Sequence, residues 1–224
     1  MIKAVLLDID NTLLDFNASA ALAMEEAFLS HGLPFVKEHF ATFKSVNDSL
    51  WLQIESGELT RAELHAKRFN IILGRLGLDY DGTAVEKSFL ENLNHCAVKM
   101  DGAEELLTYL SAKYTLCTAS NAPTVQNKTR LRFSGLKKYF THEFVSEEIG
   151  FAKPDPRFFA VCFKTLAPVK KEETVMIGDS FTADVAGAVN YGIKTFWFNQ
   201  GELGKTVPDG VTEVKKLIDI EKFL

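Results

Sequence analysis

Short apolar runs recur along this chain, and each has the length of one buried strand. They span three to six residues, are bounded by turn residues, and fall at Ala4–Leu7, Tyr114–Ala119, Glu143–Val145, Thr174–Ile177 and Thr195–Phe198. Helical patterns separate the last four runs. Strands that alternate with helices form a parallel sheet covered on both faces. We therefore predict an α/β fold with a Rossmann-like parallel sheet.

Helix boundary signals fit this alternation. The sequence Asp-Gly-Ala-Glu that starts at Asp101 is typical of an acidic capping box and predicts a helix through about residue 112. Asp155 followed by Pro156 predicts an N-cap with proline in the first helical position. Residues 183–191 are small and apolar, and Gly192 is a natural stop for a helix there.

The alternation of strands and helices is interrupted between Asp15 and about Lys99, because this segment contains almost no strand-like run. Thr60-Arg-Ala-Glu63 predicts a capping box at the start of a helix. Helical patterns cover residues 18–30, 36–56, 61–76 and 84–95. We predict two domains: residues 1–15 with 100–224 form the α/β core, and residues 16–99 form a small all-helical cap domain inserted after the first strand.

Composition excludes several classes of function. The 224 residues carry a net charge of −5 and a pI near 5.6, which argues against nucleic-acid binding. No run of 18 apolar residues predicts a membrane span, and the N-terminus lacks a signal-peptide pattern. Three cysteines without a CxxC motif, Cys96, Cys117 and Cys162, argue against a disulfide framework or a zinc site. We expect a cytoplasmic enzyme or binding protein.

Two carboxylates, Asp8 and Asp10, follow the first apolar run directly, with Thr12 just beyond them. Alternation along an extended chain turns both carboxylates to the same side. Like charges at one site raise each other's pKa unless a cation lies between them. One carboxylate can then be a nucleophile and metal ligand, and the other an acid and base. The structural alternative is a strand end followed by a polar turn.

Further polar groups follow later strands, and ligands of open α/β sheets bind at the carboxyl ends of the strands. The hydroxyl of Ser120 and the N–H groups around Asn121 can hold a phosphate oxygen, although a plain serine N-cap is the alternative. Lys153 can neutralise a phosphate or an aspartate, or be a surface lysine. Asp179 ends a strand, and Asp184 lies one turn into the next helix. Carboxylates such as these suit Mg²⁺, which prefers oxygen ligands and substrate phosphate.

In this order the motifs resemble those of the haloacid dehalogenase superfamily of aspartate-nucleophile hydrolases, and the resemblance covers the whole chain, with a C1-type helical cap. It implies that Asp8 attacks phosphorus and that Asp10 protonates the leaving oxygen, activates water and binds Mg²⁺ through its carbonyl. It also implies a phosphate-binding hydroxyl, a catalytic lysine and two metal-binding acids, at Ser120, Lys153, Asp179 and Asp184 respectively.

The second aspartate separates two branches of that family. The 2-haloacid dehalogenases lack it, because halide needs no general acid and their reaction needs no Mg²⁺. Asp10 therefore favours hydrolysis of a phosphomonoester, with Asp8 as the covalent nucleophile. Phosphate charge would be offset by Mg²⁺ and Lys153 and oriented by Ser120.

The cap resembles that of a bacterial subgroup of pyrimidine 5′-nucleotidases. The similarity covers Val46-Asn47, Leu50-Trp51, residues 57–60, Arg68-Phe69 and the extension Leu13–Phe16. Phe16 or Trp51 can stack on a base or build the cap core, and Arg68 can face the pocket or the surface. Three positions depart from the subgroup: Ser120 replaces a threonine and keeps the hydroxyl, Ala122 replaces a glycine, and Asn11 replaces an acid.

The leading prediction is thus an Mg²⁺-dependent nucleoside 5′-monophosphate phosphatase. Alternatives are a phosphatase for another small metabolite, such as phosphoglycolate or a sugar phosphate, and a 2-haloacid dehalogenase. A phosphotransferase and a non-catalytic binding protein also remain open. The expected partner is a small phosphorylated metabolite, with no nucleic acid or membrane, and the expected state is a monomer or homodimer.

Overall fold

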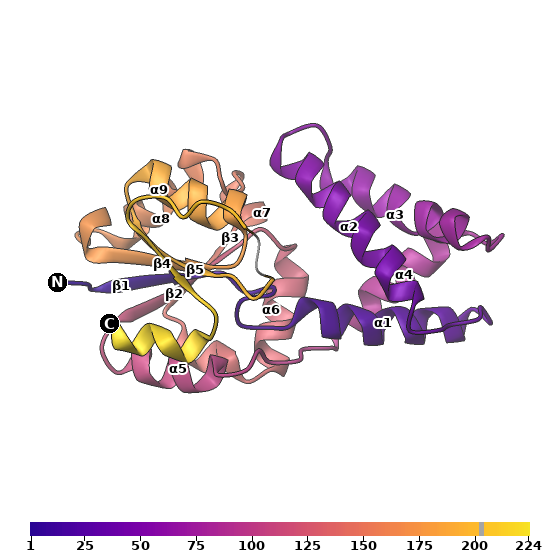
Figure 1. Cartoon of the computed structure of the whole chain (residues 1–224), viewed down its shortest axis with the longest axis horizontal. Helices are drawn as coiled ribbons and strands as arrows, with labels where there is room; N and C mark the ends of the chain where they lie inside the picture. The colour runs from indigo at the N-terminus through magenta and orange to yellow at the C-terminus, as the bar shows by residue number, and fades with distance from the viewer. Residues whose placement is uncertain (202–203) are drawn as a thin grey trace. The chain divides into compact units, whose positions relative to one another are not determined.

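A six-stranded parallel sheet forms the centre of the structure, a computed structural model that describes residues 1–201 and 204–224. Its strands follow the order β3-β2-β1-β4-β5-β6 (Figure 1). They are β1 (Ala4–Leu7), β2 (Thr115–Ser120), β3 (His142–Val145), β4 (Thr174–Gly178), β5 (Lys194–Phe198) and β6 (Val211–Val214). This is the predicted α/β fold with a Rossmann-like parallel sheet.

Helices cover both faces of the sheet, as right-handed crossovers require when the strand order reverses beside β1. On one face lie α5 (Ala103–Ser111) and the 3₁₀ helix η4 (Leu217–Lys222). The other face carries α8 (Pro156–Leu166) and α9 (Gly187–Tyr191) (Figure 1). The connections contain α6 (Thr124–Phe133), α7 (Ser146–Ile149), η1 (Leu136–Tyr139), η2 (Lys171–Glu173) and the π-helix η3 (Phe181–Ala186).

Burial on both faces explains the composition of the central strands. All four residues of β1 are buried, and so are all five of β4. Alternate strand residues, among them Leu6 and Met176, pack in one cluster with Phe158, Phe159 and Cys162 of α8. Parallel strands covered on both sides need such continuous apolar runs, which is why these runs were the clearest sequence signal.

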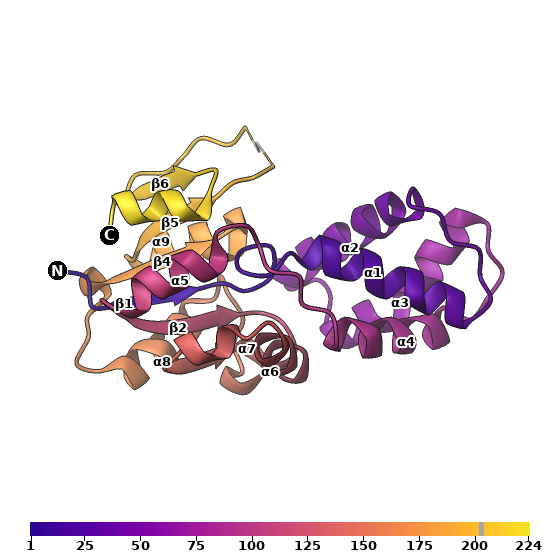
Figure 2. The same cartoon turned by 90° about the horizontal axis from the view of Figure 1, so that it is seen from below.

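Backbone contacts divide the chain into two compact units, Met1–Asp15 with Val98–Leu224 and Phe16–Ala97. The second unit consists of α1 (Phe16–Ser30), α2 (His39–Glu55), α3 (Arg61–Leu76) and α4 (Gly82–Asn94) (Figure 2). Their apolar sides share one core of aromatic and aliphatic residues, which includes Phe16 and against which Trp51 packs. Within the described ranges, no helix has both the length and the apolar content of a membrane span.

Two predicted helix starts hold in the structure and one is wrong. Thr60 and Glu63 form the reciprocal capping box of α3, and Asp155 caps α8 with Pro156 in the first turn. Asp101, in contrast, is not the N-cap of α5. That position is Gly102, in the left-handed conformation with φ 75°, and it makes no side-chain cap. Because glycine adopts this conformation without strain, the turn replaces the predicted capping box. Strand β6 was not predicted.

Candidate active site

The ends of β1 and β4 bring the first and last predicted acids side by side. Leu7 pairs with Ile177 across these strands, and the Asp8 backbone N–H donates to the Ile177 carbonyl at 2.9 Å. Asp8 therefore lies opposite Gly178, one residue before Asp179. Strand order reverses between β1 and β4, and this switch point is where open α/β sheets bind their ligands.

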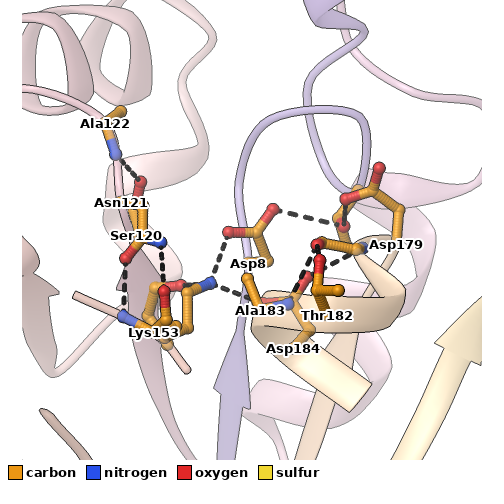
Figure 3. Close-up of polar contacts among 12 residues, drawn as sticks. Asp8, Ser120, Asn121, Ala122, Lys153, Asp179, Thr182, Ala183 and Asp184 are labelled. Atoms are coloured by element: carbon orange, nitrogen blue, oxygen red, sulfur yellow. Dashed lines mark hydrogen bonds and ion pairs between the residues drawn. The ribbon is translucent and has the colours of Figure 1, made fainter. Parts of the chain in front are cut away.

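Lys153 lies at the centre of the cluster, not on the surface, and only 2% of it is exposed. Its Nζ donates to Asp8 Oδ1 at 2.8 Å, to Asp184 Oδ1 at 2.6 Å and to the Ala119 carbonyl (Figure 3). The lysine thus ties together the ends of β1 and β2 and the first turns after β4. The surface-lysine alternative is wrong.

Three carboxylates gather around this lysine. Asp8, Asp179 and Asp184 each offer an oxygen within 4.8 Å of the others. Asp184 Oδ2 also accepts from the Ser180 backbone N–H at 3.0 Å, so the acid reaches back from η3 as expected. The Thr12 hydroxyl lies 3.2 Å from Asp179 Oδ1 and 3.5 Å from Asp8 Oδ2. Its hydrogen bonds in the structure are therefore to carboxylates.

Electrostatics at the cluster call for a cation. Burial raises the pKa of Asp8 to about 7, although Lys153 pulls it down, and Asp184 adds repulsion. Burial, followed by repulsion from Asp8 and Asp184, raises the pKa of Asp179 well above its usual range. Burial alone would lower the pKa of Lys153, but Asp184 and Asp8 outweigh it and raise that pKa. One lysine is too little positive charge for three acids that share one small region.

The donor set fits Mg²⁺. All three candidate ligands are carboxylate oxygens that converge within one small region, and burial together with mutual repulsion raises the pKa values of Asp8 and Asp179. A hard divalent cation prefers such oxygens. Asp8, Asp179 and Asp184 would therefore hold the ion, together with the Asp10 carbonyl that the family resemblance implies.

The loop after β1 brings the Asp10 carboxylate into an ion pair of its own. Asn11 has φ 59°, in the left-handed region that asparagine tolerates better than most residues. This explains locally why an asparagine can stand here. The Asp10 carboxylate accepts from Arg130 Nη1, and the Arg130 side chain is 1% exposed. Sequence reasoning missed Arg130, since arginine is usually exposed and no motif marks this position.

The loop after β2 fixes the backbone of Lys153 through Asn121, and its predicted contact with phosphate stays a prediction. Its side chain binds the main chain of Lys153 at both ends: Oδ1 accepts from the Lys153 N–H at 2.9 Å, and Nδ2 donates to the Lys153 carbonyl at 2.8 Å. Ser120 is buried, and its Oγ accepts from the Ala122 N–H at 3.1 Å. Helix α6 begins after Pro123, so Ser120 is not its N-cap.

Arg68 lies in the interior of the helical unit and not at its surface. It is 3% exposed and donates to Glu86 and Asn47 at 2.6 to 3.0 Å. Its guanidinium carbon lies 4.7 Å from the ring centre of Phe89, and the rings of Phe43 and Phe69 are also close. The surface alternative for Arg68 is therefore wrong, and a pocket role stays a prediction.

Comparison with known proteins agrees with this geometry. A model of the haloacid dehalogenase-like hydrolase family matches residues 2–192. The chain is similar to the magnesium-bound crystal structure of the HAD-hydrolase YfnB from Bacillus subtilis, with a TM-score of 0.92 and 34% identity, over 100% of this chain and 98% of that one.

Two curated relatives carry names of phosphatases. Pyrimidine 5′-nucleotidase PynA of Streptococcus pneumoniae is 34% identical over 202 residues, which cover 90% of this chain and 85% of PynA. Glyceraldehyde 3-phosphate phosphatase of Pyrococcus furiosus is 30% identical over 234 residues, which cover 98% of this chain and 92% of that protein.

Proposed function

The chain belongs to the family of haloacid dehalogenase-like hydrolases, and on this basis we propose that it is an Mg²⁺-dependent phosphomonoester hydrolase with Asp8 as its nucleophile. The observation that carries the proposal is the position of Asp8. Its carboxylate sits at the switch point of the sheet, 2.8 Å from the buried Lys153 ammonium and next to two further acids. A carboxylate beside positive charge in such a site is suited to nucleophilic attack on phosphorus.

Two steps account for hydrolysis. An Asp8 oxygen attacks phosphorus, the bond from phosphorus to the ester oxygen breaks, and Asp10 gives that oxygen a proton. Water then attacks the aspartyl-phosphate, Asp10 takes a proton back, and inorganic phosphate leaves with Asp8 restored. Lys153 stabilises the negative charge on the transferring group. When bound, Mg²⁺ supplies Lewis-acid stabilisation of the phosphoryl oxygens.

The preferred leaving group in this proposal is a nucleoside, with a pyrimidine nucleoside 5′-monophosphate as substrate. The support is the relative PynA, which is named a pyrimidine 5′-nucleotidase. In this reading the unit Phe16–Ala97 is the cap that selects the leaving group. For YfnB, the magnesium-bound structure reveals interdomain movement.

Glyceraldehyde 3-phosphate is the second candidate substrate, because a relative named as its phosphatase is 30% identical to this chain. The chemistry at Asp8 would be the same and only the leaving group would differ. A dehalogenase is less well supported, because halide leaves without a proton and the reaction would not use Asp10 as a general acid.

The test is release of inorganic phosphate from UMP, dUMP, TMP, phosphoglycolate and glyceraldehyde 3-phosphate, with Mg²⁺ or with EDTA. We expect Mg²⁺-dependent release that is fastest from the pyrimidine nucleotides. Release that is fastest from glyceraldehyde 3-phosphate would support the second candidate. No release from any ester would overturn the proposal.

Matched variants locate the chemistry. Asp8→Asn should lower kcat by roughly 10⁴-fold or more, because it removes the nucleophile. Asp219→Asn makes the same change at a carboxylate paired with Lys222 near the C-terminus, and it should leave kcat unchanged. Comparable activity of Asp8→Asn and the wild type would contradict the assignment of Asp8.

A further inference from the structure

We propose that Arg130 is a positioning residue for Asp10, so that the acid and base of the reaction is held in place by a cation from α6. The inference rests on the proposed function, because it assigns Arg130 a role in the same two-step hydrolysis. Arg130 comes from a helix between β2 and β3, 120 residues beyond Asp10 in the chain.

The contact is built as a fixed one. The Arg130 side chain is 1% exposed, whereas Asp10 is 24% exposed, so a buried cation anchors a carboxylate that still reaches solvent. Arginine holds its charge at any pH at which a protein folds. Charge-assisted hydrogen bonds of this kind are stronger than neutral ones and fix the direction of the acceptor.

The geometry also divides the work between the two oxygens of Asp10. Arg130 Nη1 donates to Oδ1. Within the part of the chain that the structure describes, Oδ2 makes no hydrogen bond to another side chain. Oδ1 is therefore the anchored oxygen, and Oδ2 is the one that can pass a proton to the ester oxygen and take one from water.

Charge balance supports a dedicated cation at this position. Asp8, Asp179 and Asp184 form one group of carboxylates, Asp10 adds repulsion at Asp8, and Lys153 contacts two of these four acids. With Lys153 alone, Asp10 would add a further unbalanced charge to acids that already repel one another. When Asp10 is in the ionised form that takes a proton from water, Arg130 pairs with it and leaves two negative charges, the amount that one Mg²⁺ balances.

The test compares two leaving groups. One substrate is the alkyl ester that the wild type hydrolyses fastest among UMP, phosphoglycolate and glyceraldehyde 3-phosphate. The other is p-nitrophenyl phosphate, whose leaving group departs without a proton. The measured quantity is kcat/KM, which reports phosphoryl transfer to Asp8. The variants are Arg130→Met, Arg130→Lys and, as a control, Arg132→Met, which changes an exposed arginine on the same helix.

If Arg130 acts through Asp10, Arg130→Met should lower kcat/KM for the alkyl ester by about 10- to 100-fold, since general acid catalysis contributes on the order of 10²–10⁴-fold. The value for p-nitrophenyl phosphate should fall less than about threefold. Arg130→Lys keeps the charge and should recover part of the loss, and it stands in for Arg130→Met should that variant not fold. Arg132→Met should match the wild type.

A double variant tests whether the effect runs through Asp10. Asp10→Asn alone and Asp10→Asn with Arg130→Met should have the same kcat/KM, because the second change removes a partner that no longer acts. Equal losses on both substrates, or additive losses in the double variant, would overturn the inference. Should the wild type hydrolyse neither ester, or Asp8→Asn match the wild type, the proposed function would fail and this inference with it.

Discussion

Gly178 is the position where one added methyl group should do most damage to the site. A Cβ built there would lie 2.3 Å from Asp184 Oδ2 and 2.4 Å from Asp184 Cγ. Contacts that short do not occur, and Asp184 is 1% exposed with little room to retreat. Gly178→Ala should therefore push the Asp184 carboxylate out of its place.

The cost follows from what Asp184 holds. The carboxylate accepts from Lys153 Nζ at 2.6 Å and from the Ser180 N–H at 3.0 Å. Each hydrogen bond to a charged group is worth about 1.5–3 kcal/mol, so losing both costs roughly 3–6 kcal/mol. Burying the methyl returns about 0.8 kcal/mol, and restricting the unfolded chain returns about 0.4–1 kcal/mol. The net loss is about 3 kcal/mol, and Tm should fall by roughly 6–12 °C.

Urea unfolding, followed by tryptophan fluorescence, measures the loss in free energy of unfolding of the α/β unit. The chain has two tryptophans, and in a Trp51→Phe background the buried Trp197 of β5 alone reports the α/β unit. Gly74→Ala is the matched control. It adds the same methyl in α3, where a Cβ would have nothing within 4 Å, and it should leave the Trp197 transition unchanged.

A second substitution checks the cause. In Gly178→Ala with Asp184→Ala the colliding carboxylate is gone, so the double variant should be little less stable than Asp184→Ala alone. Two results would refute the reasoning: a loss below about 1 kcal/mol for Gly178→Ala, or a full additional loss in the double variant.

Two further predictions concern the cation. In EDTA, the pKa of Asp8 is raised to about 7 in the folded protein. Above about pH 4 the unfolded chain has released the Asp8 proton, whereas the folded protein still holds it. The free energy of unfolding should therefore fall as the pH rises from about 4 to 7. Mg²⁺ displaces that proton, so calorimetry should show affinity rising up to about tenfold per pH unit below pH 7, and a pH-independent affinity would contradict this. Trp197→Phe removes the indole N–H that donates to the Asp179 carbonyl at 2.9 Å, and it should weaken Mg²⁺ binding roughly tenfold. Trp51→Phe is its control, and equal affinities of the two variants would argue against the contact.

Much of the arrangement was predictable because it depends on where strands end. Asp8 and Asp179 follow apolar runs that pair in register, so their meeting at one edge of the sheet follows from the fold alone. Lys153 reaches this edge of the sheet from a loop, and Asp184 reaches it from the first helical turn after a strand. Motif order carried that information, since each motif is fixed to the end of one element.

The contacts between motifs were not predictable in the same way. Nothing in the sequence says that Asn121 will use its amide on the Lys153 main chain, because asparagine after a strand serves many turns equally well. Arg130 lies on a helix with little apolar periodicity, so its burial depends on tertiary packing that no local pattern records. Gly102 shows the same limit. The acidic residues before α5 predicted a capping box, but the N-cap position is a glycine in the left-handed conformation.

The helical unit shows how a sequence likeness can reflect packing more than recognition. The positions that resemble a nucleotidase subgroup largely build that unit: Val46, Leu50 and Phe69 are buried in its core. Arg68 is bound to Asn47 and Glu86 and surrounded by phenylalanine rings. None of these side chains is free to meet a nucleoside. Under the proposed function, selection of the leaving group is therefore better sought at polar positions that reach solvent, such as His65, which is 29% exposed and lies 2.8 Å from Glu86.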